Sequence, residues 1–98
     1  MESFNDVISG DQLVLVDFFA TWCQPCKMQH PILEQLKAAV GDRLRIIMVD
    51  VDRHTDIAAQ YGIRSVPTLM LFRGGEEFYR ESGVMSKADL MALLDPFI

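Results

Sequence analysis

Cys23 and Cys26 are the residues of this sequence whose type and spacing best suit covalent chemistry. They are its only two cysteines, and only Gln24 and Pro25 separate them. A disulfide across so short a loop stabilises a fold little, because it hardly restricts the unfolded chain. A secreted domain of this size that depends on disulfides usually carries four, six or eight cysteines. The spacing therefore favours a chemical role, either thiol–disulfide exchange or metal binding, over a structural bridge.

The pair lies between a predicted buried strand and a predicted long helix. Residues Leu13–Phe19 are apolar on both strand parities apart from Asp17, as in a strand that is buried on both faces. Residues Gln24–Val40 carry apolar side chains at helical spacing. The first turn of a helix offers unpaired N–H groups and the positive end of the helix dipole, so it stabilises a thiolate and lowers the pKa of a cysteine. Pro25 suits this turn because its missing N–H costs nothing there.

Asp17 interrupts the apolar strand that precedes the cysteines. Burying an ionised carboxylate is unfavourable unless the group is paired or hydrogen bonded. Two interpretations follow from the strand pattern alone. Asp17 is either a proton-transfer group with a raised pKa, of the kind found at active sites, or a hydrogen-bonded structural aspartate.

A metal site is the main alternative to exchange chemistry at the cysteines. His30 lies four residues after Cys26, on the same side of the predicted helix, and His54 is the other histidine. With Cys23, these side chains could supply zinc ligands, because closed zinc sites use four ligands that are usually Cys or His. Base rates instead favour a solvated helix position for His30. The apolar Trp22 next to the cysteines suits a disulfide face better, so we expect no bound metal.

The remaining elements predict an α/β fold in which a mixed sheet lies between helices. Capping boxes predict a helix from Ser3 to about Ser9 and a last helix from Ser86. The other predicted elements are a strand at Leu44–Val51, a short helix from Asp52 to about Tyr61, and strands at Thr68–Phe72 and Glu76–Glu81. Residues 1–98 are expected to form a single domain.

Some of the remaining side chains are expected to have packing or capping roles. Met28, Met48 and Met70 fall at core spacing in the predicted elements, so we expect them to pack inside. Asp50 and Asp52 share one strand parity, as a pair of acid–base carboxylates would. A strand end and a helix cap explain these two residues better.

Composition and charge exclude several other classes of protein. With 9 Lys and Arg against 14 Asp and Glu, the chain has a formal net charge of −5. An acidic domain gains nothing from the counterion release that drives nucleic-acid binding, and anionic lipid repels it. No apolar run reaches the roughly 18–20 residues of a membrane-spanning helix, and the first residues lack the pattern of a signal peptide. We expect a cytoplasmic monomer that binds neither nucleic acid nor membrane.

The cysteine segment and its surroundings resemble the thioredoxin family. The matching residues are Leu15–Met28, Pro31, Tyr61–Leu69, the Gly74–Gly75 turn and Gly83. A cysteine pair alone would be a weak signal, but the pair together with Asp17, Pro31 and Val66–Pro67 at these spacings is specific. The resemblance covers nearly the whole chain. It implies the thioredoxin fold and thiol–disulfide oxidoreductase activity, with reduction of protein disulfides as the leading hypothesis.

The family pattern, carried over by position, implies a role for each residue of the exchange site. Cys23 resembles the nucleophile that attacks a substrate disulfide, and Cys26 resembles the resolving thiol. Asp17 resembles the buried carboxylate that moves protons to and from Cys26. No bound cofactor is implied, because the electrons travel as dithiol and disulfide. The implied partners are disulfide-containing proteins and an electron donor of the thioredoxin reductase type.

The resemblance also implies a substrate-binding surface beside the cysteines. Val66–Pro67 matches the cis-proline site of the family, where the residue before proline pairs its backbone with an extended substrate segment. Trp22 and Gly83 would form much of the apolar docking surface with Val66, and Gln24 and Pro25 would contribute from between the cysteines. A partner-binding module that uses this apolar face, with redox chemistry secondary, is the non-enzymatic alternative.

Four departures from the family pattern carry information, and one of them is Phe19 at a position where many members have Trp. Gln24 replaces the usual Gly between the cysteines, which leaves a disulfide oxidase or isomerase as an alternative to a reductase. Met48 replaces the Lys that many members have beside the buried carboxylate, which predicts a higher pKa for Asp17 than in those members. The usual first strand is missing, so we expect a four-stranded sheet with Leu44–Val51 at one edge.

Overall fold

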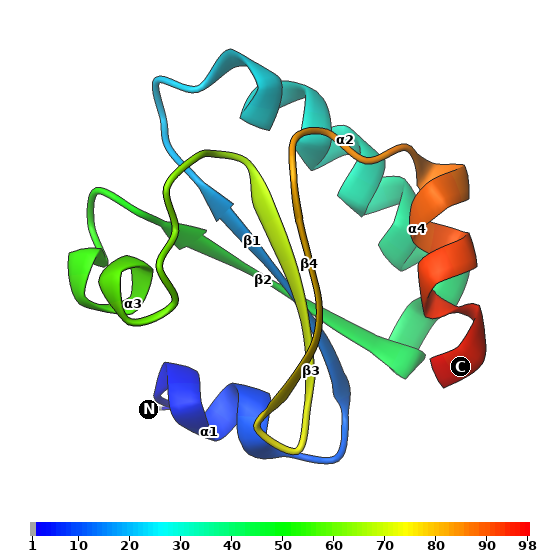
Figure 1. Ribbon diagram of the computed structural model, residues 1–98. Coiled ribbons are helices and arrows are strands. Elements are labelled where there is room, and N and C mark those ends of the chain that lie inside the picture. The colour runs from blue at the N-terminus through cyan, green and yellow to red at the C-terminus, as the bar shows by residue number, and fades with distance from the viewer. Residues whose placement is uncertain (1) are drawn as a thin grey trace.

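The computed structural model describes residues 2–98, which fold around a mixed β-sheet (Figure 1). Strands β1 (Leu13–Phe19), β2 (Leu44–Asp50), β3 (Thr68–Arg73) and β4 (Glu76–Ser82) pair in the order β2-β1-β3-β4. β2 runs parallel to β1, whereas β3 is antiparallel to both β1 and β4. For the described part of the chain, the sheet therefore has the four strands predicted, with β2 at one edge.

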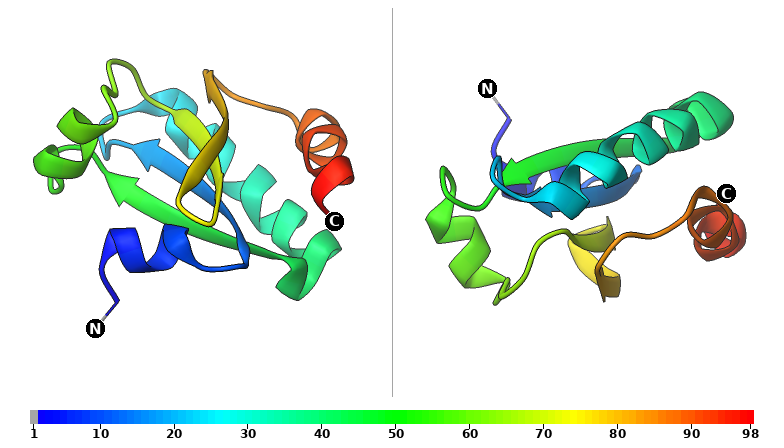
Figure 2. Two further views of the ribbon diagram at one scale, coloured as in Figure 1. Left: turned by 60° about the horizontal axis from the view of Figure 1, so that its bottom comes forward. Right: turned by 90° about the horizontal axis from the view of Figure 1, so that it is seen from above.

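Helices cover both faces of this sheet, as expected for the α/β class. α2 (Gln24–Val40) and α4 (Lys87–Leu94) lie side by side on one face (Figure 1). α1 (Phe4–Ser9) and α3 (Thr55–Gln60) lie on the other face, as the turned views of Figure 2 show. The order of elements is the predicted β-α-β-α-β-β-α core after an N-terminal helix.

β1 separates two hydrophobic cores because its side chains alternate between the faces of the sheet. The core under α2 and α4 contains Leu13, Leu15, Leu33, Leu36, Leu69, Leu71 and Leu90. The core under α1 and α3 contains Ile8, Val14, Val16, Phe18, Met70 and Phe72. Asp17 has the parity of the first set, so its side chain faces α2 from within a strand that is buried on both sides.

Side-chain caps begin the first and last helices, as predicted. Ser3 Oγ accepts a hydrogen bond from the N–H of Asp6, and the Asp6 carboxylate accepts one from the N–H of Ser3, which completes the capping box of α1. Ser86 Oγ accepts a hydrogen bond from the N–H of Asp89 at the start of α4. Each bond satisfies a backbone donor that the first helical turn leaves unpaired.

The buried side of α2 does not include Met28. Its buried residues are Cys26, Gln29, Leu33, Leu36 and Val40, at steps of three and four. Met28 lies off this stripe and is 60% exposed. Met48 is 42% exposed because β2 is an edge strand with a neighbour on one side only. The prediction that both methionines pack inside is therefore wrong, whereas Met70 is buried as predicted.

Candidate active site

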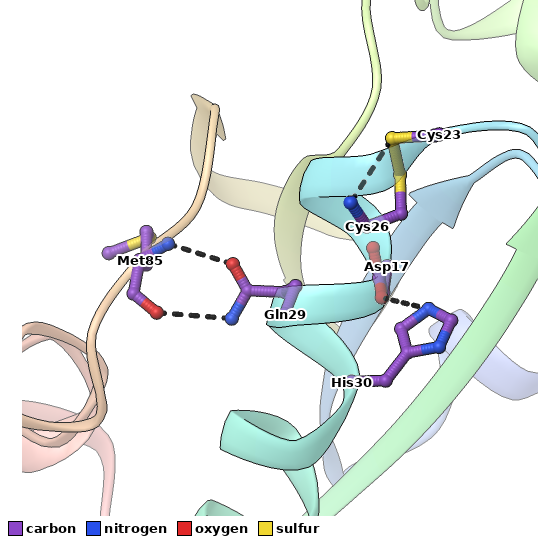
Figure 3. A network of polar contacts seen from close by, with 6 residues as sticks. All are labelled: Asp17, Cys23, Cys26, Gln29, His30 and Met85. Atoms are coloured by element: carbon purple, nitrogen blue, oxygen red, sulfur yellow. Dashed lines mark hydrogen bonds and ion pairs between the residues drawn. A yellow bond between two sulfur atoms is a disulfide. The ribbon is translucent and has the colours of Figure 1, made fainter.

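Cys23 and Cys26 form a disulfide at the N-terminal end of α2 (Figure 3). Their Cα atoms lie 5.3 Å apart, and Cys23 is the N-cap residue of the helix. The backbone N–H of Cys26 donates a hydrogen bond to Cys23 Sγ, with an N···S distance of 3.1 Å. This N–H belongs to the first helical turn, so it would stabilise negative charge on Cys23 Sγ once the disulfide is reduced.

Exposed residues surround a disulfide that is itself almost buried. Cys23 and Cys26 are 3% and 1% exposed. Their cluster also includes Ala20, Phe19, Val51 and Val66. Trp22, by contrast, is 70% exposed, and Gln24 and Pro25 are exposed as well. These three side chains therefore form exposed surface next to the cysteines in the chain.

The segment that precedes β3 lies beside the disulfide. Its Val66–Pro67 peptide bond is cis, as the family resemblance implied. Val66 packs against the cysteines and shares a shallow depression with Trp22. The N–H of Gly83 donates to the carbonyl oxygen of Pro67 at 2.9 Å, from a backbone with a φ of +95° that suits glycine. The fold thus brings Val66 beside the cysteine pair and Trp22, and it brings Gly83 to Pro67.

Asp17 lies under the cysteine end of α2 and is completely buried. Among the described residues, neither of its carboxylate oxygens has a hydrogen-bond partner. Burial raises the pKa of Asp17 from its ordinary value of 3.8 to about 7. A carboxyl group with this pKa can both accept and release a proton near neutral pH.

His30 is a site residue that sequence reasoning missed. Its Nε2 atom lies 3.5 Å from Asp17 Oδ2 (Figure 3), and its ring meets Phe19 edge-on with ring centroids 5.3 Å apart. The side chain is 33% exposed, so His30 is partly solvated and also contacts the buried carboxyl group. Its spacing of four residues from Cys26 is the signal that the sequence offered, because residues so spaced share one face of a helix.

Gln29 fixes α2 to the segment before α4. The side chain is completely buried. Gln29 Nε2 donates to the Met85 carbonyl oxygen at 3.1 Å, and Gln29 Oε1 accepts from the Met85 N–H at 2.7 Å (Figure 3). These bonds pair both ends of the amide with both backbone groups of Met85. A polar residue three positions after Cys26, on the buried stripe, was the available sequence signal.

Trp22 is held by a carboxylate from a distant loop. Its indole Nε1–H donates to Asp52 Oδ2 at 2.8 Å. Asp52 therefore does not cap α3, which begins at Thr55 with His54 as its N-cap residue, and that capping prediction is wrong. The Asp50 side chain accepts the N–H of Asp52 at 2.9 Å and so orders the loop that presents Asp52 to Trp22.

The fold brings together two sulfur atoms, a carboxyl group and an imidazole at this end of α2. Within residues 2–98, no three His, Cys, Asp or Glu side chains are arranged to hold a metal ion. Over the same residues, no helix has both the length and the apolar character needed to cross a bilayer. The assembled groups can exchange electrons between thiols and a disulfide and can move the accompanying protons.

The sequence is similar to proteins of one family. The chain matches the thioredoxin family model over residues 1–96. A thioredoxin from Chlamydia caviae is 48% identical over 94 residues, which cover 96% of this chain and 90% of that protein. A bifunctional thioredoxin reductase/thioredoxin from Mycobacterium leprae is 42% identical over 88 residues, which cover 90% of this chain and 19% of that protein.

A solved structure gives the same result in three dimensions. The thioredoxin of Malassezia sympodialis has a TM-score of 0.87 against this chain and shares 37% of its sequence. The match covers 96% of this chain and 84% of that one. Sequence and structure therefore agree on one group of relatives.

Proposed function

Because the chain belongs to the thioredoxin family, we propose that it reduces disulfide bonds in other proteins by dithiol–disulfide exchange. Membership makes the chain a thiol–disulfide oxidoreductase. The proposal adds the direction of electron transfer and a role for each residue. The observation that carries it is the Cys23–Cys26 disulfide at the N-terminus of α2, with the buried Asp17 carboxyl group under the same end of the helix.

Cys23 performs the first step of the proposed exchange. Its thiolate attacks one sulfur of the substrate disulfide, so a new S–S bond joins Cys23 to the substrate while the substrate disulfide breaks. The other substrate sulfur leaves as a thiolate and takes a proton from solvent. The hydrogen bond from the Cys26 N–H supports this role, because it stabilises the attacking thiolate.

Cys26 performs the second step with the help of Asp17. The ionised Asp17 carboxylate accepts the proton of the Cys26 thiol, and the resulting thiolate attacks Cys23 Sγ. The mixed disulfide breaks, and the second substrate sulfur leaves as a thiolate. Two electrons have then passed to the substrate, and the Cys23–Cys26 disulfide has formed. The burial-raised pKa of Asp17, about 7, supports this role because it lets the group act as a base near neutral pH.

Substrate binding is assigned to the surface around the disulfide. The proposed contact residues are Trp22, Gln24, Pro25, Val66, Pro67 and Gly83. The Trp22 side chain is 70% exposed next to the disulfide, which supports a docking role because Trp is enriched among the residues that contribute most to protein–protein binding. The backbone of Val66 is suited to pair with an extended substrate segment as an added strand would.

The proposed partners follow from the chemistry. Oxidised Cys23–Cys26 must be reduced again, and a thioredoxin-reductase-type donor is the proposed source of electrons. The combination of both activities in the Mycobacterium leprae relative supports this pairing. The exchange needs no bound cofactor, since dithiol and disulfide carry the electrons. We further propose that residues 1–98 act as a single-domain monomer in the reducing cytoplasm, because one chain supplies every group of the site.

Two serine substitutions test this function. Wild type, Cys23→Ser and Cys26→Ser would be compared in the reduction of insulin with dithiothreitol as electron donor. We expect both variants to lose turnover. We also expect Cys26→Ser to accumulate a mixed disulfide with insulin through Cys23, because the resolving thiol is absent. Turnover that survives Cys23→Ser, or a substrate bound through Cys26 instead, would overturn the proposal.

A further inference from the structure

The buried acids of the exchange site need a proton connection to solvent. Asp17 is 0% exposed and Cys26 is 1% exposed. Asp17 can take the proton of Cys26 only while it is ionised, so its own protonation has to equilibrate with solvent between reactions. Within residues 2–98, no hydrogen bond leads outward from either Asp17 oxygen. A neighbouring group that reaches the surface is therefore needed.

His30 has the position that this connection requires. Its Nε2 atom is buried and lies 3.5 Å from Asp17 Oδ2, whereas the side chain as a whole is 33% exposed. Figure 3 shows Nε2 toward Asp17 and the second ring nitrogen, Nδ1, on the side of the ring away from it. The distance is a few tenths of an ångström beyond an ordinary hydrogen bond, so a small rotation of the ring closes it.

We propose that His30 carries protons between solvent and the buried Asp17 carboxyl group, and so limits how fast Asp17 can accept the proton of Cys26. This inference rests on the proposed function, because it matters only if Asp17 serves Cys26 during exchange. Imidazole suits the task, since it can bind a proton on one ring nitrogen while it releases another from the second.

The residues that flank Asp17 in the sheet cannot carry a proton, so a carrier has to come from α2. Met48 of β2 and Leu69 of β3 flank Asp17 in register, and neither side chain ionises. From α2, the ionisable groups at this end of the helix are Cys26, Lys27 and His30, and of these Lys27 is exposed to solvent. Among the described residues, His30 is the basic group in ion-pair contact with Asp17.

The surroundings of His30 also suit a carrier. Its ring packs edge-on against Phe19, which orients the imidazole without competing for a proton. The surface depression beside the ring is lined by Leu33, Glu34, Lys37, Ile46 and Met48. Glu34 and Lys37 are the charged residues there, and the Lys37 ammonium group donates to the carbonyl oxygens of Gly41 and Leu44.

The proton transfers balance over one redox cycle. When Cys26 attacks, its proton passes to Asp17 and from there to Nε2 of neutral His30, and the proton on Nδ1 leaves to solvent. When the disulfide is reduced again, the proton on Nε2 passes to ionised Asp17 and from there to the Cys26 thiolate, and Nδ1 regains a proton from solvent. No electrons move through His30, and the ring returns to its starting tautomer.

The test compares reduced wild type, His30→Ala and His30→Gln, with His54→Gln as the matched control because His54 is exposed at the start of α3. Oxidation by insulin would be followed by Trp22 fluorescence between about pH 5 and 9. We expect both His30 variants to react about 10-fold more slowly near neutral pH, which is less than the roughly 100-fold of a direct general acid or base because His30 acts through Asp17. The difference in rate between wild type and the His30 variants should become smaller toward pH 9, because the Cys26 thiol then ionises more readily without a base. Added imidazole should restore His30→Ala but not His30→Gln, whose side chain fills the space.

Two results would overturn the inference. One is a rate and pH profile for the His30 variants equal to those of wild type and His54→Gln. The other is a slower His30→Ala that imidazole does not restore, which would mean that the ring only shapes the site. Cys23→Ser run in parallel separates the two proposals. If it still reduces insulin, the proposed function itself fails; if it is inactive while the His30 variants behave as wild type, only the proton carrier is excluded.

Discussion

Asp17 and Met48 lie opposite each other in the parallel pairing of β1 and β2. The carboxyl group is completely buried, and the methionine beside it is 42% exposed at the sheet edge. The side chain next to Asp17 in the sheet therefore offers no charge to stabilise the carboxylate. Desolvation is left as the dominant influence, and it raises the pKa of Asp17 to about 7.

Met48→Lys should lower the pKa of Asp17 by about one unit, because an ammonium group a few ångströms away favours the ionised carboxylate. The exposed edge position lets the Lys reach solvent, so the fold should tolerate it. NMR titration of the Asp17 carboxyl carbon measures the effect. Met28→Lys, on the exposed side of α2, is the control and should leave the titration unchanged. An Asp17 pKa that is the same in Met48→Lys as in wild type would contradict the account.

Asp17→Asn should stabilise the protein at neutral and higher pH. The pKa of Asp17 is about 7 in the folded state against 3.8 ordinarily, so the folded state holds a proton that the unfolded state has lost. The contribution of this proton to the free energy of unfolding is therefore complete below about pH 4. It decreases as the pH rises from there and is lost above about pH 7. We expect Asp17→Asn to be more stable than wild type by about 2–4 kcal/mol at pH 8, with the difference vanishing near pH 4. Urea unfolding at both pH values measures this, and equal stability at pH 8 would refute it.

Gln29→Ala should destabilise the fold by about 2–4 kcal/mol, because it leaves both backbone groups of Met85 without partners in a buried position. Gln35→Ala on the exposed face of α2 is the matched control, with an expected change within about 0.5 kcal/mol. Guanidinium unfolding of the two variants provides the comparison. A Gln29 variant as stable as the Gln35 variant would show that the link between α2 and the Met85 segment contributes nothing.

Asp52→Ala should release the indole of Trp22, which Asp52 holds through a 2.8 Å hydrogen bond. Fluorescence anisotropy decay reports this directly because Trp22 is the only tryptophan. We expect faster motion of the ring, and insulin reduction slower by about 3-fold because a freed docking side chain loses more entropy on binding. Asp56→Ala, which removes an exposed carboxylate from the first turn of α3, should change neither quantity. An unchanged anisotropy decay in Asp52→Ala would exclude the anchoring role.

The elements could be predicted from the sequence because their signals are local. The two-parity apolar run of β1, the helical spacing of α2, and the caps at Ser3 and Ser86 each act within a few residues. The cysteine pair is also local, since its two residues share one helical turn. The edge position of β2 within residues 2–98 agrees with the strands predicted from the sequence.

The supporting contacts could not be predicted, because they join residues that only the tertiary fold brings together. Trp22 and Asp52 are 30 positions apart, and Gln29 and Met85 are 56 apart. Local patterns predicted a helix cap at Asp52 and a core position for Met28. In the fold, Asp52 instead accepts a hydrogen bond from the distant Trp22, and Met28 is exposed to solvent. His30 was visible as a neighbour of Cys26 on the helix, but its contact with Asp17 depends on how α2 crosses β1.

The reduction potential of the Cys23–Cys26 pair tests the central claim most directly. The protein would be equilibrated across thiol–disulfide buffers, with its redox state measured by thiol alkylation and by Trp22 fluorescence. A protein that donates electrons to other disulfides should have a potential below about −220 mV, near the value of about −270 mV that is characteristic of thioredoxins. A potential above about −200 mV would contradict the account, because the pair would then take electrons from most protein thiols and act as an oxidase or isomerase.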